Sequence, residues 1–312
     1  DEIKNLQIPG NADNKTAFWK LLSEPEVLNK SLIYDQYDAN IQTNTIKQPG
    51  LLGAAVIRVK ETGRAIAMAA QCDPRANFVD PKIGAARAVA AAGRKVAMSG
   101  ATPLAITDCL NYGNPQNPEV MWQFAQGCEG IKEACRELNT PVVSGNVSLY
   151  NDTEGVSVYP TPAIVTVGVN EDANASLPSV FTCAGTAIYV LGETKGEFAA
   201  SLYAKALFDA VGGELAAVYY KKERALWDLV IEANKSGALE FANSVGVGGV
   251  AITLAKMACL SSLGAECKFD VKKPDFIFDE SFSRAIVGVK DEAKFESLAA
   301  KHGVKFQKIG SV

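Results

Sequence analysis

The 312-residue chain contains a single histidine, and that scarcity excludes more chemistry than any other feature of its composition. His302 lies near the end of the chain, between Lys301 and Gly303. A Ser/His/Asp or Cys/His catalytic arrangement requires a histidine that a pocket can enclose, and a histidine-rich zinc site requires several. We therefore expect His302 at the solvated end of a helix. Any chemistry should rest on carboxylates, amides, hydroxyls, backbone N–H groups and metal ions.

The cysteines lack the spacing of a metal or disulfide framework. No two of them form a Cys-x-x-Cys pair, and their number, seven, is odd. Neither a zinc ribbon nor a fully paired set of disulfides fits such a pattern. We therefore expect buried free thiols in a reducing, cytoplasmic compartment. The residues concerned are Cys72, Cys109, Cys128, Cys135, Cys183, Cys259 and Cys267.

Long apolar runs and a strong charge imbalance are also missing. No apolar run approaches the roughly 20 residues of a membrane span, and the start, Asp1-Glu2-Ile3-Lys4, lacks the regions of a signal peptide. The net charge of -4 offers no basic footprint for nucleic acid. With 48 % hydrophobic residues, the composition is that of a soluble globular protein. The length predicts two domains, and the missing initiator Met suggests a fragment or a processed chain.

Residues 1–50 are interpreted as a lead-in with turn signals at Pro9-Gly10-Asn11 and Pro49-Gly50 and one helix over residues 17–30. A first α/β block is predicted over residues 51–175. Its clearest element is a helix over residues 121–138, where apolar residues recur at spacings of 3 and 4 and share one face. The block's other predicted elements are a strand pair at 54–59 and 65–71, a helix at 82–98, short strands at 104–107 and 141–143, and a buried strand at 163–169.

A second α/β block is predicted over residues 183–312, after a polar, proline-containing boundary at 170–184. Strands that alternate with helices in both blocks indicate the α/β class with two domains. The second block's predicted strands are 187–192, 285–289 and 304–309, and its predicted helices are 197–210, 223–235, 246–260 and 291–301.

Two segments place polar residues directly after a short predicted strand, at residues 107–115 and 144–151. The carboxyl ends of strands are common ligand sites in α/β proteins. Glycines let the backbone approach a ligand, and exposed N–H groups hold phosphate oxygens. Carboxylate and amide oxygens suit Mg²⁺. The segments together predict a metal–phosphate site, and the alternative is that Asp, Asn, Gly and Pro simply form turns.

Three weaker candidates each have a plain structural alternative. The run Gly246-Val247-Gly248-Gly249 before a predicted helix is either a phosphate site at the helix N-terminus or a tight turn. Asp279-Glu280-Ser281 is either a polar site or a solvated loop. Arg75 and Lys82 either meet phosphates or are ordinary surface residues.

Several segments resemble the small-subunit (subunit II) type of phosphoribosylformylglycinamidine synthase. The most specific are residues 102–115, TPLAITDCLNYGNP, and 141–151, PVVSGNVSLYN. Other similar segments are Gln36-Tyr37-Asp38, Tyr159-Pro160-Thr161-Pro162, and residues 191–197 and 280–284 of the second block. The resemblance spans nearly the whole chain.

The resemblance implies a ligase of de novo purine biosynthesis. The family converts formylglycinamide ribonucleotide, ATP and glutamine into formylglycinamidine ribonucleotide, ADP, phosphate and glutamate. ATP activates the substrate amide oxygen as an iminophosphate, and ammonia then displaces phosphate. A glutaminase subunit produces the ammonia, and a small assembly subunit helps to form the complex. The full family chain resembles a tandem duplication of an aminoimidazole ribonucleotide synthetase-like unit, in which a barrel-forming N-terminal α/β domain precedes a C-terminal α/β domain.

The chain is most similar to the second half of that family, with residues 1–50 as the link from a missing first half. By this resemblance Asp108 and Gly145 contact ATP, Asn146 ligates Mg²⁺ and Ser148 contacts the ribonucleotide substrate. ATP and Mg²⁺ are the implied cofactors. No catalytic residue is implied in this half, because the family's catalytic histidines and acidic metal ligands lie in the first.

Some positions depart from the family. Ser244 and Val247 stand where related sequences have Asp, and Phe282 replaces the Gln of a Glu-Ser-Gln substrate motif. The run Cys72-Asp73-Pro74-Arg75 follows an Asp-Gly motif only loosely. We therefore expect no independent second active site. The chain should instead lend its two polar segments to a cleft shared with the first half.

Three functions compete. The first is a ligase half that completes the synthase site, and the second is a non-catalytic nucleotide-binding scaffold of the synthase complex. The third, another member of the superfamily such as selenophosphate synthetase, is disfavoured by the run Gly145-Asn146-Val147-Ser148. We expect the isolated chain to be inactive, and a homodimer through residues 54–59 and 163–169 is a further expected arrangement.

Overall fold

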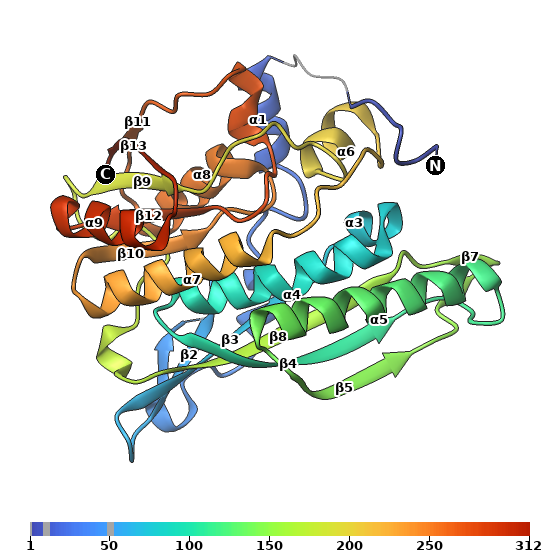
Figure 1. Cartoon of the computed structure of the whole chain (residues 1–312), viewed down its shortest axis with the longest axis horizontal. Coiled ribbons are helices and arrows are strands. Elements are labelled where there is room, and N and C mark those ends of the chain that lie inside the picture. The colour runs from blue at the N-terminus through green and yellow to red at the C-terminus, as the bar shows by residue number, and fades with distance from the viewer. Residues whose placement is uncertain (1, 9–12, 49–52) are drawn as a thin grey trace.

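The computed structural model of the chain describes residues 2–8, 13–48 and 53–312, which form two β-sheets with helices packed around them (Figure 1). The expected turns at Pro9-Gly10-Asn11 and Pro49-Gly50 and the expected start of the first block at residue 51 lie outside the described residues. The long helix α4 (Pro81–Met98) lies between the two sheets and contacts both. The fold is mixed α/β, as the alternation of strands and helices predicted.

The first sheet has six strands in the order β1-β2-β3-β8-β4-β5. The β2–β3 hairpin is confirmed, β8 is antiparallel to β3 and β4, and β5 is parallel to β4. The sheet is open, with β1 and β5 at its edges, so the described residues of this chain do not close a barrel. The strands are β1 (Thr45–Lys47), β2 (Ala55–Val59), β3 (Arg64–Gln71), β4 (Thr102–Asn111), β5 (Val142–Ser148) and β8 (Thr161–Asn170), and a separate hairpin joins β6 (Asp152–Thr153) to β7 (Val156–Ser157).

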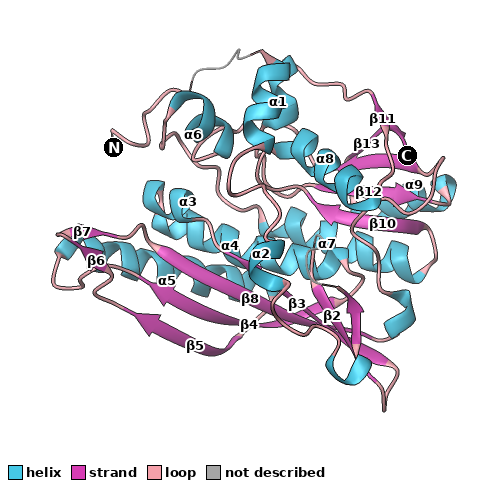
Figure 2. Cartoon of the chain, turned by 180° about the vertical axis from the view of Figure 1, so that it is seen from behind, coloured by secondary structure: helices cyan, strands magenta, loops and turns pink. Residues whose placement is uncertain are grey.

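Among the residues that the structure describes, long helices cover one face of this sheet and leave the other uncovered (Figure 2). Alternate residues of β8, among them Ile164 and Thr166, are buried beneath α4 and α5 (Pro118–Leu138), while the residues between them are half-buried. Gly168 is needed on the covered face because a Cβ there would lie 2.5 Å from the carbonyl oxygen of Thr102. The expected buried strand at 163–169 is therefore wrong in detail, because its valines lie on the uncovered face.

The second sheet has five strands in the order β10-β12-β9-β13-β11, and all neighbours are antiparallel. Helices cover both faces, because Ile188 and Val190 of β9 pack toward α8 and Tyr189 and Leu191 pack toward α7 and α9. The strands are β9 (Ala187–Leu191), β10 (Leu239–Ser244), β11 (Glu266–Cys267), β12 (Ala285–Val289) and β13 (Phe306–Ser311), and the helices are α6 (Leu202–Phe208), α7 (Tyr220–Lys235), α8 (Gly249–Ser261) and α9 (Glu292–His302).

The N-terminal segment packs against the second domain. Helix α1 (Asn14–Leu22) buries Ala17 and Leu21 against α6 and α8. The expected helix over 17–30 ends early, because Pro25 disfavours helical geometry in the residue before it. The expected helix over 197–210 begins only at Leu202. The remaining short elements are α2 (Ser31–Tyr34), α3 (Pro74–Val79), η1 (Ile41–Thr43), η2 (Ala173–Ala175) and η3 (Pro274–Phe278).

The two α/β units meet where α4 packs against α7. A Cβ at Gly93 would lie 2.3 Å from the indole of Trp227, so only glycine lets the ring approach this closely. Nε of Arg94 lies 3.0 Å from Oε1 of Glu223, and both side chains are buried. The indole N–H of Trp227 donates to the same carboxylate oxygen at 2.8 Å. Because buried charges require partners, this network fixes how the two units join.

All seven cysteines are free, as expected, but only Cys135 is buried. The expectation of buried thiols is wrong for four residues that lie in loops, near the end of α8 or on the edge strand β11; these are Cys72, Cys183, Cys259 and Cys267. Within the described ranges, no helix has both the length and the apolar character to cross a membrane.

We predict that Glu223→Ala lowers the free energy of unfolding by roughly 3–5 kcal/mol, because it leaves Arg94 as a buried charge without its partner. Urea denaturation measures the change. Glu232→Ala on the same helix is the control, because Glu232 pairs with Lys301 and His302 at the surface and its removal should change stability little. Equal effects from the two variants would contradict the assigned role of the buried network.

Candidate functional site

The two polar segments expected as loops form parts of paired strands. Strand β4 continues to Asn111 and β5 to Ser148, and they pair in parallel with Asp108 opposite Gly145. Asp, Asn and Gly are depleted in strands, so local preference alone favoured loops. Pairing with β8 along the whole length of β4 overrides that preference. Because β5 is the last strand of the sheet, its outer edge has no partner strand in the described part of the chain.

Asp108 and Gly145 lie on the face of the sheet that α5 covers. A Cβ at Gly145 would lie 2.3 Å from Oδ1 of Asp108, so the missing side chain keeps room for this carboxylate. Partial burial raises the pKa of Asp108 above its usual value. Across the described residues the Asp108 carboxylate accepts no hydrogen bond. It is therefore free to receive a donor from a ligand.

A groove of about 360 Å³ runs between these strands and α5, next to Asp108. Lys132 and Arg136 supply cationic groups along it. Burial raises the pKa of Cys135 to about 11 and also raises that of Cys128, so both thiols stay protonated at neutral pH. Because the thiolate is the nucleophilic form of cysteine, the groove is suited to binding rather than to thiol chemistry.

Asn146 and Ser148 lie on the opposite, uncovered face of the sheet. Nδ2 of Asn146 lies 3.7 Å from Sγ of Cys109 on the neighbouring strand, and Asn111 stands opposite Ser148. Within the described structure the carboxamide oxygen of Asn146 has no partner. The Ser148 hydroxyl lies 3.3 Å from Oδ1 of Asn151, whose Nδ2 donates to the carbonyl oxygen of Ser148 at 2.9 Å.

The four predicted site residues thus share the β4–β5 pair but do not converge on one point. Asp108 of β4 and Gly145 of β5 lie on one face of this strand pair, and Asn146 and Ser148 of β5 lie on the other. A single ligand reaches both sets only if it lies across the open edge of β5. The sequence did not reveal that Cys109 and Asn111 share the face of Asn146, although the two-residue alternation of a strand would have shown it.

The glycine run before α8 is a tight turn, and the backbone N–H of Gly248 already has a side-chain acceptor. Gly248 and Gly249 have positive φ values of 76° and 69°. The backbone N–H of Gly248 and that of Leu202 each donate to Oε1 of Glu280 at 2.9 Å. A carboxylate of the protein therefore takes the position where the phosphate alternative would have placed a ligand.

The remaining predicted candidates also have partners within the protein. Arg75 pairs with Glu26 at 2.6 Å and Lys82 with Glu133 at 2.8 Å. Asp279 forms a buried ion pair of 2.7 Å with Arg284 and accepts the backbone N–H of Gly196. The alternative of a solvated loop is therefore wrong for Asp279, which is buried.

His302 is the last residue of α9, as expected for a helix end. Its Nε2 lies 2.6 Å from Oε2 of Glu232 on α7, and the imidazole is only partly exposed. The histidine belongs to the second domain and is not part of the β4–β5 pair.

A second polar region lies between the two domains, and it includes Glu280 and Ser281 of the segment for which a polar site was one of the two interpretations. Asp73, Arg87, Arg94 and Glu280 line a cavity of about 100 Å³ there. The Phe282 ring occupies one wall, 4.4 Å from the Arg94 guanidinium and 5.2 Å from that of Arg87. Phe282 thus uses an aromatic face to partner two cations at the position where the related motif has glutamine.

Comparison with known proteins places each domain. Residues 53–170 match the AIR synthase related protein N-terminal domain, and residues 184–312 match the AIR synthase related protein C-terminal domain. The chain is similar to phosphoribosylformylglycinamidine synthase subunit PurL of Campylobacter curvus, with 84 % identity over 310 residues. That alignment covers 99 % of this chain and 42 % of the relative, so the chain spans less than half of the relative's length.

Solved structures agree in fold. T. maritima PurL complexed with ATP has a TM-score of 0.64 at 23 % identity, covering 99 % of this chain and 43 % of that one. T. maritima PurL complexed with FGAR has a TM-score of 0.65 at 21 % identity, covering 99 % and 42 %. Both likenesses concern the fold, because the identity is low.

We predict a pH-dependent stability that is traceable to Glu280. Burial chiefly, and the nearby Asp73 charge to a smaller extent, raise the pKa of Glu280 to about 7, against 4.5 for an ordinary glutamate. Because the pKa of Glu280 is higher in the folded state than in the unfolded state, its protonation stabilises the fold fully when the pH is below the unfolded-state pKa of 4.5. This contribution is lost as the pH rises through the folded-state pKa of about 7.

Glu280→Gln keeps an oxygen for the two N–H donors and removes the titration. We predict that the free energy of unfolding of the variant, relative to that of the unmodified chain, rises by roughly 1–3 kcal/mol from pH 5 to pH 8.5. Urea denaturation at several pH values measures this difference. A constant difference between the two proteins across this range would contradict the assignment.

Proposed function

The chain belongs to the AIR synthase related family, and on this premise we propose that it is the second half of a small-subunit phosphoribosylformylglycinamidine synthase. In this role its residues contact ATP, Mg²⁺ and the substrate while the synthase converts formylglycinamide ribonucleotide into formylglycinamidine ribonucleotide, with glutamine as the amido donor. The observation that carries the proposal is the 84 % identity to a PurL subunit over 310 residues. The existence of PurL complexes with ATP and with FGAR supports the ligand classes.

The open edge of β5 is the proposed place of these contacts. Asp108 has a free carboxylate for a donor on the nucleotide, and Gly145 leaves the approach to it open. The Ser148 hydroxyl can donate to or accept from a polar ribonucleotide. Phosphoryl transfer depends chiefly on positioning and on stabilisation of charge, so amide, hydroxyl and carboxylate groups suffice for this contribution.

Mg²⁺ fits this site only as an ion shared with other ligands. The described residues contain no group of three or more His, Cys, Asp or Glu side chains arranged for a metal. The free carboxamide oxygen of Asn146 suits a hard cation, whereas Asp108 lies on the other face of the sheet. Mg²⁺ commonly keeps waters and phosphate oxygens as ligands, and when bound it would neutralise phosphate charge. Asn146 would then supply one ligand beside those of the nucleotide.

A partner must supply the rest of the site. Neither the β4–β5 pair nor the groove beside it contains a histidine, and the chain spans 42 % of its relative. We therefore expect the first half of the synthase to provide the catalytic groups. The isolated chain should show no synthase activity, and ammonia- and ATP-dependent product formation by it would contradict this assignment.

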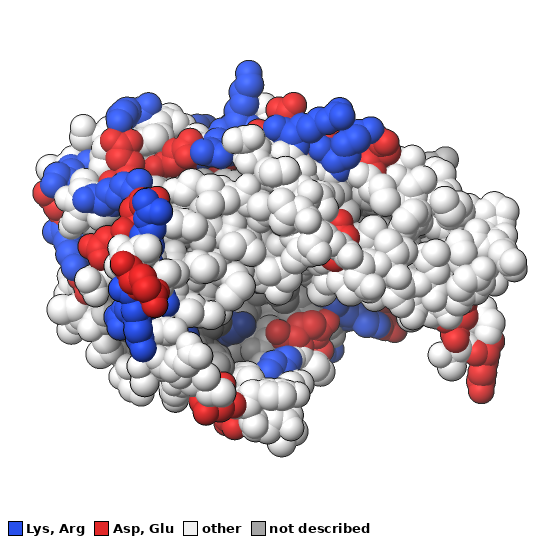
Figure 3. Space-filling view, turned by 90° about the horizontal axis from the view of Figure 1, so that it is seen from below, with Lys and Arg blue, Asp and Glu red and all other residues white. Residues whose placement is uncertain are grey.

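The uncovered face of the six-stranded sheet is the proposed contact with that partner. Seen from below, a broad area without charge lies between charged margins (Figure 3). Leu104 and Val143, on two strands of this sheet, are 50 % and 69 % exposed, and the valines of β8 are half-buried. We expect the first half of the synthase to cover this face, and a second copy of the chain to do so when that half is absent.

The proposed complex also contains a glutaminase subunit and a small assembly subunit, which would supply ammonia and hold the parts together. We place it in the cytoplasm, because seven free cysteines, four of them exposed, suit a reducing compartment.

The alternative function is a nucleotide-binding scaffold. Arg87, Arg94 and Glu280 line the cavity between the two domains, but each already has a partner within the protein. The cavity is therefore small, which favours a scaffold over a catalytic site there.

Asn146→Ala and Ser148→Ala, made in a full-length synthase, distinguish the two functions. We predict that each lowers kcat by roughly 100-fold, because each removes a positioned polar contact to the reacting groups. Thermal unfolding should be unchanged. Asn174→Ala, at an exposed position, is the matched control. Unaltered kinetics in both site variants would favour the scaffold.

Gly145→Ala tests the approach to Asp108. The new methyl group would meet Oδ1 of Asp108 at 2.3 Å, and the carboxylate must turn away. We predict about tenfold weaker binding of an ATP analogue to the full-length synthase, which corresponds to about 1.4 kcal/mol, with little change in stability. Gly264→Ala is the control, because no atom lies within 4 Å of a Cβ there. Equal affinities in the two variants would contradict a nucleotide at this edge.

A further inference from the structure

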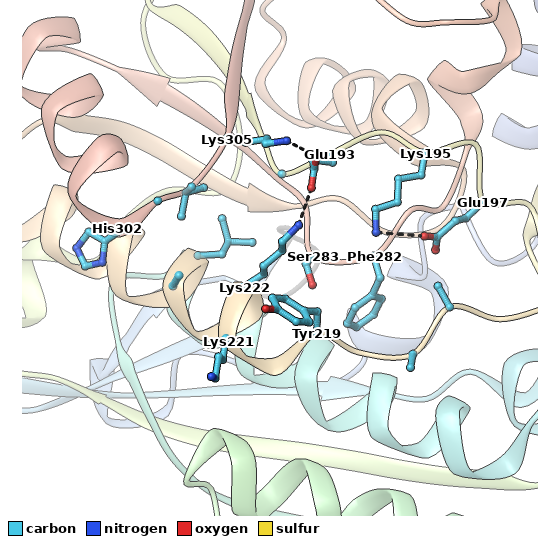
Figure 4. A pocket seen from close by; sticks show the side chains of 17 residues that line it. Glu193, Lys195, Glu197, Tyr219, Lys221, Lys222, Phe282, Ser283, His302 and Lys305 are labelled. Atoms are coloured by element: carbon cyan, nitrogen blue, oxygen red, sulfur yellow. Dashed lines mark hydrogen bonds and ion pairs between the residues drawn. The ribbon is translucent and has the colours of Figure 1, made fainter.

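A second cavity, of about 210 Å³, lies in the C-terminal domain and uses none of the residues assigned above to the β5 edge. It is bounded by the loop after β9, the start of α7 and the loop after α9 (Figure 4). Four lysines, two glutamates and two aromatic residues stand in its wall; these are Lys195, Lys221, Lys222, Lys305, Glu193, Glu197, Tyr219 and Phe282. We call it the lysine cavity.

The lysine cavity carries more positive than negative charge, although the whole chain has a net charge of -4. Nζ of Lys222 and Nζ of Lys305 each lie 2.7 Å from a different oxygen of Glu193. On the other side, Lys195 lies 3.8 Å from Glu197, which Arg87 approaches to 3.2 Å. Each carboxylate therefore faces two cations, and the cluster has an excess charge of about two.

Glu193 occupies the place that an anionic ligand would take. The two lysines hold the pKa of its carboxyl at about 2, so it remains charged. Each carboxylate oxygen receives one ammonium group, as two oxygens of a phosphate would. The side chains of Lys222 and Lys305 are 57 % and 72 % exposed, and ion pairs at such positions are weak and exchangeable.

The backbone and the aromatic residues shape the space between the cations. Gly192 has a φ of 88°, and a Cβ there would lie 2.3 Å from the carbonyl oxygen of Ser283. Figure 4 shows Ser283 between Glu193 and the ring of Phe282, while Lys221 points away from Glu193. Tyr219 is 59 % exposed and presents a ring 5.5 Å from Nζ of Lys222. The cavity thus combines cationic groups with the exposed aromatic ring of Tyr219 beside them.

We propose that the lysine cavity binds a small phosphate monoester. Its phosphate lies among Lys195, Lys222 and Lys305, and its organic group packs against Tyr219. The bound phosphate displaces the Glu193 carboxylate from its two lysines. The proposed binding residues all belong to the second domain, and the inference is independent of the proposed synthase function.

The test is isothermal titration calorimetry of the purified chain with AMP, orthophosphate and adenosine. AMP combines a phosphate monoester with a planar ring, and each other compound supplies one part of it. We expect AMP to bind more tightly than orthophosphate, and adenosine not to bind. Binding of adenosine as tight as that of AMP would overturn the cationic assignment.

Variants locate the binding. Replacing both Lys222 and Lys305 with Gln should weaken AMP binding at least tenfold, while Lys301→Gln, on the neighbouring helix, is the matched control and should change nothing. Glu193→Gln should strengthen binding several-fold, because it frees two lysines and removes a competing anion. Wild-type affinity in the double variant, or weaker binding in Glu193→Gln with an unchanged melting temperature, would overturn the proposal.

One further variant distinguishes the aromatic part of the lysine cavity from its phosphate-binding part, and another distinguishes the lysine cavity from the β5 edge. Tyr219→Ala should weaken AMP binding and leave orthophosphate binding unchanged, and an equal effect on both ligands would contradict the aromatic subsite. Asn146→Ala, at the β5 edge, should leave AMP binding to the isolated chain unchanged. Loss of binding in Asn146→Ala would assign the nucleotide to that edge and overturn the lysine cavity, whatever the outcome for synthase activity.

Discussion

The buried pair of Arg94 and Glu223 is the interaction on which the arrangement of the two domains depends. It joins the helix that covers the first sheet to a helix that covers the second. Beside it, the absent side chain of Gly93 admits the ring of Trp227, whose N–H donates to the same Glu223 oxygen that Arg94 faces. Each group requires the others, because an unpaired charge at this depth costs several kcal/mol. The junction is therefore specific in geometry, whatever its net contribution to stability.

In the part of the chain that the structure describes, one face of the first sheet lies uncovered, and that face and the edge strand β5 carry the proposed function. A parallel strand at the end of a sheet has free backbone groups on one side and side chains on both faces. Strand β5 presents Gly145 on one face, beside Asp108 of β4, and Asn146 and Ser148 on the other. Such a site holds a ligand only when a second surface closes over it.

The sequence predicted the long elements well. The helix at 121–138 and the hairpin of β2 and β3 are confirmed, because their apolar periodicity reflects burial directly. The polar ends of β4 and β5 were predicted as loops, because Asp, Asn and Gly disfavour strands, and only the long-range pairing of β4 with β8 and of β5 with β4 makes them extended. The split of the four site residues between two faces follows from that register. A prediction of loops for these segments gives no strand register, so it could not predict the split between the two faces.

Polar contacts between residues distant in the chain could not be predicted from the sequence. Glu280 accepts hydrogen bonds from the backbone N–H groups of Gly248 and Leu202, and Arg94 pairs with Glu223, only because of the tertiary packing. The phosphate alternative for the Gly246–Gly249 turn was reasonable from sequence, and it is the tertiary position of Glu280 that excludes it. Likewise, the two lysines that share Glu193 come from α7 and from the loop after α9, which are 83 residues apart in the chain.

In the proposed synthase, β5 forms one side of a nucleotide site that the rest of the protein completes. Hydrogen–deuterium exchange of a full-length synthase, with and without an ATP analogue, tests it most directly. The account predicts slower exchange on nucleotide binding in peptides that contain residues 142–148, and no such change in these peptides of the isolated chain. Protection confined to peptides outside this chain, with residues 142–148 unaffected, would contradict it.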